Sequence, residues 1–471
     1  MKLFCHSVCA FVASVLVFPS CFAQKVTVHP VSPDNALNPL PAQHLSFGKL
    51  KPSVQVGTII HVDDKQRFQT MDGFGASLTD SSAWLLETQL SPALRKETMR
   101  ALFDPEHGAG LSFLRQPLGA SDLSLTHYSY DDMPAGKTDA GVTKFSIAHD
   151  ETYILPALRE ALRLNPKITV MATPWSPPGW MKTSDSMNGG SLREDAMAEF
   201  ATYLVKSVHA YGKAGVPIVY LSVQNEPLYE TKDYPGMLMR ADQQKHFIGE
   251  YLGPALDKAA LHPKLLAYDH NWDHPEYPLE VLSYAPAAKY LSGTAFHCYG
   301  GRASAQDQVH DAYPQLGLWM TECSGGTWQK DNLLAATSRL ILESTQHWAK
   351  SVVLWGIALD TEHGPHLGGC GTCRGLVEID RTRDPHTVKY TIDFYAMQAA
   401  SKYVRPGAVR IASTDFGRQG LQTAAFQNKD GSIALLVLNN AEHAEKWMLE
   451  WKGHFVAAEI PAGSLATYVW K

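Results

Sequence analysis

The sequence predicts an α/β protein built on a (β/α)8 barrel. Between residues 72 and 395, short apolar runs alternate with segments of helical character. About eight such units occur, and no G-x-G-x-x-G motif follows a strand as it does in a dinucleotide-binding sheet. Polar or aromatic residues come directly after the runs. This is the pattern of barrel strands that open into a site at their carboxyl ends.

The predicted barrel strands are short and mainly apolar or β-branched, as buried parallel strands are. The first lies near Gly73 to Ala76, and it is followed by seven more at intervals that leave room for a helix. These seven are Leu111 to Leu114, Ile168 to Ala172, Ile218 to Val223, Leu265 to Tyr268, Thr294 to Phe296, Leu318 to Thr321 and Val352 to Trp355.

Helical signals fill the intervals. Ser91 is suited to cap a helix and Pro92 to occupy its first turn, so a helix is expected over 93–103. The segment from Thr152 to Leu164 has apolar residues at helical spacing and is followed by Pro166. Two further helices are expected from Ala196 to Val208 and from Asp242 to Leu256.

Both ends of the chain have β character outside the barrel. Val54 to Val62 alternates and is rich in β-branched residues, which favours a strand. Near the C-terminus similar runs are separated by turn sequences. These runs are Leu421 to Gln427, Ile433 to Leu438 and Ser464 to Trp470.

Composition excludes several classes of protein. The 471 residues are 45% hydrophobic and 19% charged, which is enough to bury a large core and rules out a mainly disordered chain. The net charge of −6 gives no basic field for nucleic acid. No run after the N-terminus reaches the length of a transmembrane helix.

Residues 1–23 resemble a secretory signal peptide. Lys2 supplies the positive start, Leu3 to Val17 is mostly apolar, and small residues precede Gln24. We therefore expect export to the periplasm or the extracellular space. Lipidation at Cys21 is the alternative, although Phe18-Pro19-Ser20 before it matches a lipoprotein signal poorly.

Two glutamates are the leading candidates for chemistry. Glu226 follows the fourth predicted strand and Glu322 the seventh, so they can face each other across the barrel mouth. Opposed carboxylates suit glycoside hydrolysis, in which one protonates the leaving oxygen and the other attacks the anomeric carbon. The alternative is that either glutamate is a structural carboxylate paired with a cation. A metal site formed by His297, Glu322 and Asp269 lacks the short ligand spacing of known motifs, so we expect no metal and no cofactor.

At several separate motifs the chain resembles glycoside hydrolase family 30, the glucosylceramidase (acid β-glucosidase) family within the clan A retaining enzymes. The resemblance extends from about residue 55 to 471. Its motifs are Asn225-Glu226-Pro227, the strand-ending Glu322, Gln69 to Asp80, Thr173 to Thr183, Asn188 to Leu192, and Phe394 to Gly407.

The resemblance implies roles for individual residues. Glu226 matches the acid/base and Glu322 the nucleophile. A set of residues matches positions that line the family's sugar pocket. Tyr234 lies near the position of a tyrosine in the family, but its distance in the sequence from Glu226 differs. His297 is expected either as a donor behind the site or as a buried core residue. The matching pocket residues are Arg115, Asp122, Trp175, Asn225, Tyr299 and Trp355.

The resemblance also implies that the two β-like ends form one accompanying β-sandwich. The expected organisation is a signal peptide at 1–23, an N-terminal sandwich segment at 24–70, the catalytic barrel at 71–398 and the C-terminal sandwich at 399–471.

Four cysteines follow the expected cleavage site. Cys370 and Cys373 form a single C-x-x-C, which is most simply a small local disulfide in an exported protein. A redox or metal role for it would require a context that the sequence lacks. Cys298 and Cys323 have apolar neighbours and are expected to be small buried residues.

The expected function is a retaining β-glycosidase of the β-glucosidase or glucosylceramidase type, acting on a β-linked glucoside, glucolipid or glucan. An endo-β-1,6-glucanase is the alternative within the family, because residues 360–375 depart from the glucosylceramidase loop. The alternative from another class, a non-catalytic carbohydrate-binding barrel, would be expected to have lost one of the two carboxylates.

Overall fold

A computed structural model describes residues 24–34, 40–49, 57–330 and 332–471. The expected signal peptide, with its lipidation alternative at Cys21, and the start of the predicted strand at Val54 lie outside these residues. Within them, no helix is long and apolar enough to cross a membrane.

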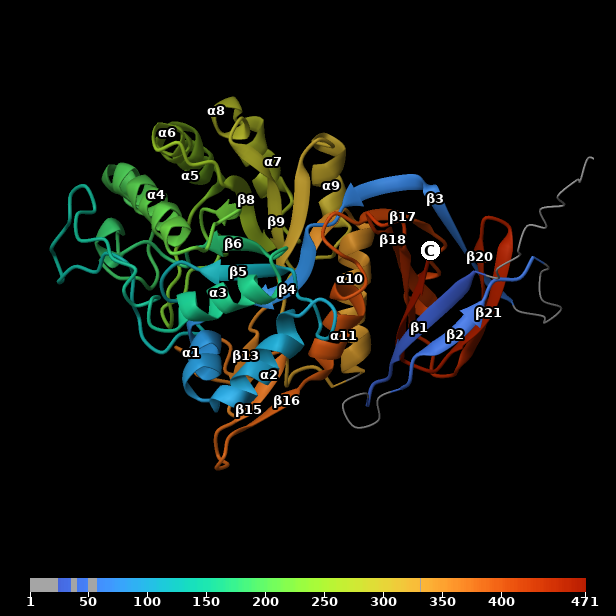
Figure 1. Cartoon of the computed structure of the whole chain (residues 1–471). Coiled ribbons are helices and arrows are strands. Elements are labelled where there is room, and N and C mark those ends of the chain that lie inside the picture. Colours follow the sequence, from blue (N-terminus) through green and yellow to red (C-terminus); the bar gives the residue numbers. More distant parts are fainter. Residues whose placement is uncertain (1–23, 35–39, 50–56, 331) are drawn as a thin grey trace, which may run out of the picture.

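Eight parallel strands form a closed barrel, which confirms the predicted fold (Figure 1). The last strand pairs with the first, with Val352 opposite Phe74, so the sheet has no open edge. In chain order the strands are β4 (Gly73–Ser77), β5 (Phe113–Pro117), β6 (Thr169–Thr173), β7 (Tyr220–Ser222), β8 (Lys264–Asn271), β9 (Leu291–His297), β10 (Gly317–Glu322) and β12 (Ala349–Leu354).

Helices surround the barrel in the intervals where they were expected. The Ser91 side chain accepts a hydrogen bond from the Leu94 amide and caps α2, as its position predicted. The helices are α1 (Asp80–Thr88), α2 (Pro92–Phe103), α3 (Ile154–Leu164), α4 (Met197–Lys213), α5 (Ala241–His246), α6 (Gly253–Lys258), α7 (Glu276–Ser283), α8 (Ala285–Ala288), α9 (Ala305–Ala312), α10 (Leu333–Gln346) and α11 (Ile392–Ser401).

The helix expected from Asp242 to Leu256 is not continuous. A π-helical turn, η3 (Phe247–Leu252), separates α5 from α6. Pro254 lies in the first turn of α6 and has no amide hydrogen to donate to a carbonyl of the preceding turn. The helical ladder therefore changes register just before it.

The two chain ends form one nine-stranded β structure beside the barrel, where Figure 1 shows blue strands from the N-terminus next to red ones from the C-terminus. Strand β3 (Thr58–Thr70) pairs with both β17 and β20 and so links the two parts. The other strands are β1 (Lys25–Val31), β2 (Gln43–Ser46), β17 (Val409–Ser413), β18 (Leu421–Gln427), β19 (Ile433–Asn439), β20 (Glu445–Trp451), β21 (His454–Ile460) and β22 (Leu465–Trp470). This arrangement is the predicted β-sandwich.

Short strands follow β10 and β12 at the carboxyl end of the barrel. The segment after β12 forms a small three-stranded sheet from β13 (Ala358–Asp360), β15 (Val377–Asp380) and β16 (Thr387–Tyr390). A two-stranded ribbon joins β11 (Gly325–Gly326) to β14 (Cys373–Arg374). This ribbon brings the segment after β10 against the segment after β12. Of the single turns, η1 (Gly179–Met181) follows β6, η2 (Glu194–Ala196) directly precedes α4, and η4 (Gly417–Gln419) lies between β17 and β18 of the nine-stranded structure.

Candidate active site

Arg115 on β5 organises the floor of the barrel mouth. Its side chain is fully buried, and it donates to Glu322 Oε2 at 2.5 Å, Asn225 Oδ1 at 2.7 Å and Asp269 Oδ2 at 2.9 Å. One guanidinium thus contacts Asn225, which follows β7, Asp269 on β8 and Glu322 on β10. Its planar fork of donors suits several acceptors at fixed angles.

A β-bulge in β10 turns the Glu322 side chain toward the mouth of the barrel. Trp319 belongs to the core inside the barrel, and strict alternation would turn Met320 and Glu322 outward. The register against β9 shifts between Met320 and Glu322 instead. Thr321 already points inward, because its hydroxyl donates to Asp269, and the bulge brings Glu322 to the same side.

Two donors fix the buried carboxylate of Glu322. Arg115 holds Oε2, and the Tyr299 hydroxyl donates to Oε1 at 2.8 Å. Burial raises the pKa of Glu322, and the nearby Glu226 carboxylate adds to this rise. His297, Arg115 and the Tyr299 hydroxyl act in the opposite direction, because all three favour the ionised form.

Glu226 follows β7 with a left-handed backbone, φ +44°. Its amide donates to the Asp269 carbonyl at 3.0 Å, which fixes this unusual conformation. Its Oε1 lies 3.2 Å from Nδ1 of His297. One oxygen of Glu226, one of Glu322 and a ring nitrogen of His297 all lie within 4.8 Å of one another. The two carboxylates are therefore close enough for the double displacement of a retaining glycosidase, in which the carboxyl groups lie about 5 Å apart.

His297 at the end of β9 connects two carboxylates. Its Nε2 lies 3.0 Å from Asp269 Oδ1, while Nδ1 faces Glu226. Burial alone would lower its pKa, but Glu322, Asp269 and Glu226 outweigh burial and raise the pKa of His297 to about 9. Asp269 stays ionised, since Arg115 and His297 overcome the effect of its burial and lower its pKa.

The metal-binding alternative of His297, Glu322 and Asp269 does not fit this geometry. Arg115 donates to both Glu322 and Asp269, so a guanidinium occupies the position between those two carboxylates. A cation there would meet a fixed positive charge.

The pocket above these groups has a volume of about 400 Å³. Trp175 and Trp355 stack with centroids 4.7 Å apart, and Trp355 Nε1 donates to Asp122 Oδ2 at 3.3 Å. Asp122 Oδ1 has no partner among the described residues, which leaves it to accept from a ligand. Burial raises the pKa of Asp122 to about 7. Tyr234 also lines the pocket.

All the predicted site residues are thus brought together around one pocket, with Arg115 forming its floor. Several further residues line the pocket that no sequence motif marks as part of it. His270 is one of them: its Nε2 lies 3.9 Å from Glu226 Oε1, and burial lowers its pKa to about 4, so the ring is neutral. The others are Tyr229, Asn271, Ser324 and Trp328, together with Cys370 and Cys373 as wall residues.

Asp72 is an acidic residue beside the first barrel strand that lies outside the pocket. It precedes β4 and lies at the opposite end of the barrel, where it accepts from the Tyr220 hydroxyl at 2.9 Å and from Trp319 Nε1 at 2.8 Å. The strand itself contains the glycines that follow, so its polar end is Ser77, not Asp72.

Both pairs of cysteines are disulfide-bonded. The Cys370–Cys373 bridge is the one that the sequence suggested. The expectation that Cys298 and Cys323 are small buried residues was wrong, because they form a second disulfide. They are 25 residues apart but follow the ends of the neighbouring strands β9 and β10, which brings their Cα atoms to 5.3 Å.

Comparisons with known proteins agree with this architecture. The glycosyl hydrolase family 30 TIM-barrel domain matches residues 71–403, and the family's beta sandwich domain matches 407–468. The chain is 35% identical to an endo-1,6-beta-D-glucanase of Neurospora crassa over 388 residues, 79% of each protein. It is 28% identical to the lysosomal acid glucosylceramidase of Mus musculus over 456 residues, 91% of this chain and 86% of the other. The solved structure of the endo-beta1,6-glucanase BT3312 superposes with a TM-score of 0.86 at 32% identity, covering 95% of this chain and 99% of that one.

Proposed function

The chain belongs to glycosyl hydrolase family 30 and is a glycoside hydrolase; from this premise we propose that it cleaves β-1,6-linked glucan with retention of the anomeric configuration. The observation that carries the proposal is the meeting of Glu226 and Glu322, within 4.8 Å, under one sugar-sized pocket. Similarity to endo-1,6-beta-glucanases, at 35% and 32% identity, exceeds that to glucosylceramidases, at 28–29%. It therefore favours the glucan over glucosylceramide, which remains the second candidate.

The reaction proceeds in two displacements. Glu322 attacks the anomeric carbon while Glu226 gives its proton to the glycosidic oxygen, so the leaving sugar departs as an alcohol. Glu226 then removes a proton from water, which attacks the same carbon and releases Glu322 as a carboxylate. Two inversions restore the β configuration.

Glu226 and His297 share the proton that the first step consumes. His297 is charged in the free protein and its Nδ1 faces Glu226 Oε1 at 3.2 Å. Burial raises the pKa of Glu226, but the hydrogen bond and charge of His297 and the nearby cationic groups outweigh burial and lower this pKa, so in the free protein the proton resides mainly on the imidazole. Transfer across this contact yields the acid form of Glu226. Activity should therefore fall at alkaline pH, as the pair loses its shared proton.

The remaining pocket groups bind the sugar. Asp122 accepts from hydroxyl groups through its unpartnered oxygen. Asn225, whose Oδ1 is taken by Arg115, has its amide nitrogen available to the 2-hydroxyl. Trp175 and Trp355 present apolar faces to the C–H bonds of the ring. A non-catalytic sugar-binding barrel would need none of the charge arrangement around Glu322.

The decisive experiment is a substrate comparison with the purified protein. Hydrolysis of pustulan, a β-1,6-glucan, is expected at a higher kcat/KM than hydrolysis of glucosylceramide, with an aryl β-glucoside as a common reference. Turnover of glucosylceramide alone would favour the second candidate. Inactivity on all three would contradict the proposal.

The stereochemical course is predicted as well. Proton NMR of the first product from pustulan should show the β anomer of the new reducing end, with the α anomer appearing only later by mutarotation. An initial α anomer would mean that water attacks directly and that Glu322 is not a nucleophile.

Trp328 is expected to bind the leaving part of a glucan chain. It lies at the pocket mouth with 49% of its surface exposed, and its ring packs directly on the backbone of Gly326, where a Cβ would come within 1.9 Å of it. Trp328→Ala should raise KM for pustulan by about three- to tenfold, since an aromatic stacking contact contributes about 1 kcal/mol. Hydrolysis of an aryl β-glucoside should change less than twofold.

A matched control is Phe416→Ala. Phe416 is similarly exposed, at 44%, but it does not line the pocket. Equal effects of the two substitutions, or an equal effect of Trp328→Ala on both substrates, would show that Trp328 has no specific contact with the glucan.

We also propose that the protein is exported through residues 1–23. The charged, then apolar, then small-residue pattern supports this. Two disulfides support it independently, because such bridges persist in oxidising compartments. Edman sequencing of secreted protein should begin at Gln24, and retention at the membrane through Cys21 would favour the lipoprotein form instead.

A further inference from the structure

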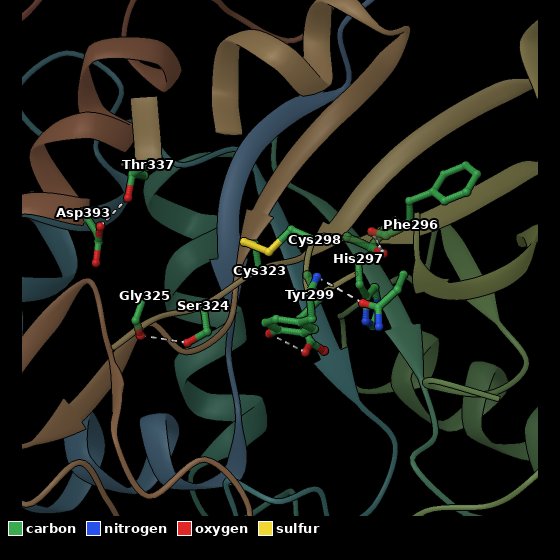
Figure 2. Close-up of a disulfide and its surroundings, with 12 residues drawn as sticks. Phe296, His297, Cys298, Tyr299, Cys323, Ser324, Gly325, Thr337 and Asp393 are labelled. Atoms are coloured by element: carbon green, nitrogen blue, oxygen red, sulfur yellow. Dashed lines mark hydrogen bonds between the residues drawn. A yellow bond between two sulfur atoms is a disulfide. The ribbon is translucent and has the colours of Figure 1, made fainter. Parts of the chain in front are cut away.

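The Cys298–Cys323 disulfide joins the ends of the two strands that carry catalytic groups (Figure 2). Strand pairing between β9 and β10 ends at His297 opposite Glu322. The cysteines are the next residue on each strand. The covalent bridge therefore links the two strands directly after the last pair of the hydrogen-bonded ladder.

Each cysteine is adjacent in sequence to residues of the site. Cys298 lies between His297, which faces Glu226, and Tyr299, which donates to Glu322. Cys323 directly follows Glu322, and its carbonyl accepts from the Trp355 amide at 2.7 Å. A shift of either cysteine would therefore be transmitted to at least two groups of the site.

The rest of the structure holds Tyr299 less firmly than it holds Arg115. Tyr299 is 45% exposed, whereas Arg115 is fully buried, so packing constrains Tyr299 less. Its amide donates to Asn271 Oδ1 at 3.1 Å, but Gly300 and Gly301 follow, the latter with φ +80°. The bulge in β10 also interrupts the ladder just before Glu322. The bridge is a covalent restraint at this irregular place.

We propose that the Cys298–Cys323 disulfide is a positioning element that holds the Tyr299 hydroxyl against Glu322. The bridge touches no substrate atom; it acts through Tyr299 and the backbone of Glu322. Its significance for catalysis rests on the proposed function. With the bridge open, the Tyr299 hydrogen bond lengthens or is lost, and the carboxylate of Glu322 loses one of its two donors.

The effect depends on every charged or titratable group that faces Glu322. Of these, only Tyr299 is adjacent in sequence to a bridge cysteine and also donates to Glu322. The other groups have hydrogen bonds or ion pairs of their own that do not involve the bridge. They are Arg115 on β5, Asp122 after β5, Glu226 after β7, Asp269 on β8 and His297 on β9. Tyr234 after β7 is a further titratable group that faces Glu322.

The test is the double variant Cys298→Ser/Cys323→Ser. For an aryl β-glucoside we expect kcat to fall about tenfold, since a hydrogen bond to a charged group has about this value, with KM changed less than threefold. The acidic limb of the kcat/KM profile should move to higher pH by about half a unit to one unit, because Glu322 is more easily protonated. A bridge that serves stability alone would lower Tm and leave this limb in place.

Tyr299→Phe provides the matched comparison, because it removes the same hydrogen bond and leaves the disulfide intact. It should reproduce the shift of the acidic limb. In the Tyr299→Phe protein, opening the bridge should then cost less than twofold further in kcat. If the two effects multiply fully, the bridge does not act through Tyr299 and the proposal is wrong.

A readout without turnover separates this inference from the proposed function. The carboxyl carbon of Glu322 can be followed by NMR in ¹³C-glutamate-labelled protein and assigned with Glu322→Gln. Its pKa should rise on loss of the disulfide even if the natural substrate is not a glucan. An unchanged pKa would overturn the inference, whereas inactivity of the wild type would overturn only the function.

Discussion

Replacing Glu322 by glutamine is expected to lower kcat/KM for every β-glucoside by on the order of 10⁵-fold, the scale seen when a catalytic nucleophile is removed. This corresponds to about 7 kcal/mol of lost transition-state stabilisation. The amide has nearly the shape of the carboxylate but is a very weak nucleophile, so no glycosyl-enzyme forms. Because the amide fills the place of the carboxylate, added azide cannot reach the anomeric carbon from that side and should not restore turnover.

The fold is expected to survive this substitution. Arg115 loses one charged partner but keeps Asp269 at 2.9 Å and Asn225 at 2.7 Å, so its buried charge stays compensated. Thermal unfolding of Glu322→Gln should show a Tm within a few degrees of the wild type. Glu106→Gln, at an exposed glutamate outside the pocket, is the matched control and should keep full activity. A Glu322→Gln protein with activity within tenfold of the wild type would assign the nucleophile elsewhere.

The barrel was predictable because its strands are buried on both faces. Runs such as Ile168 to Ala172 contain few polar residues, and each lies within a few residues of an observed strand. The polar residues that follow them then have to gather at one end. This is why Glu226, Arg115 and Glu322, far apart in the sequence, could be assigned to one site from the sequence alone.

The directions in which individual side chains point were not predictable, because they depend on departures from the regular inward–outward alternation of side chains along a strand. Asp269 enters the barrel only because Tyr268 and Asp269 both have a left-handed backbone, with φ +72° and +68°. The sequence carries no signal for that bulge or for the one before Glu322. The ion pairs of Asp269 with Arg115 and His297 were therefore not predicted, although the sequence offered Asp269 as a possible metal ligand.

The second disulfide and the pocket mouth were missed for a different reason. Cys298 and Cys323 become neighbours only when β9 and β10 are placed side by side in register, and single-sequence patterns give no register between parallel strands. Tyr229 and Trp328 lie on irregular segments whose course depends on tertiary contacts, such as the close approach of Trp328 to Gly326. No motif marks such residues.

Glu226→Ala is the second substitution with a large expected effect, and the effect depends on the leaving group. For pustulan, whose leaving alcohol needs a proton, kcat/KM should fall by about 10³- to 10⁴-fold, the upper part of the range for general acid catalysis. For dinitrophenyl β-glucoside, whose phenolate leaves without a proton, kcat/KM should fall less than tenfold. Steady-state kinetics on the two substrates give the comparison directly.

The same variant should accumulate the glycosyl-enzyme, because Glu226 is also the base that activates water. Dinitrophenol should then be released in a burst followed by slow turnover. Azide fits the space left by the shortened side chain, needs no base and attacks the anomeric carbon on the β face. It should raise kcat for the dinitrophenyl substrate and produce β-glucosyl azide, releasing Glu322 as a carboxylate.

Formation of the α-azide would mean that azide had replaced Glu322 instead, and the roles of the two glutamates would have to be exchanged. Because the predicted burst, rescue and product configuration all differ from those of Glu322→Gln, the pair of variants distinguishes acid/base from nucleophile even though their oxygens lie within 4.8 Å of each other.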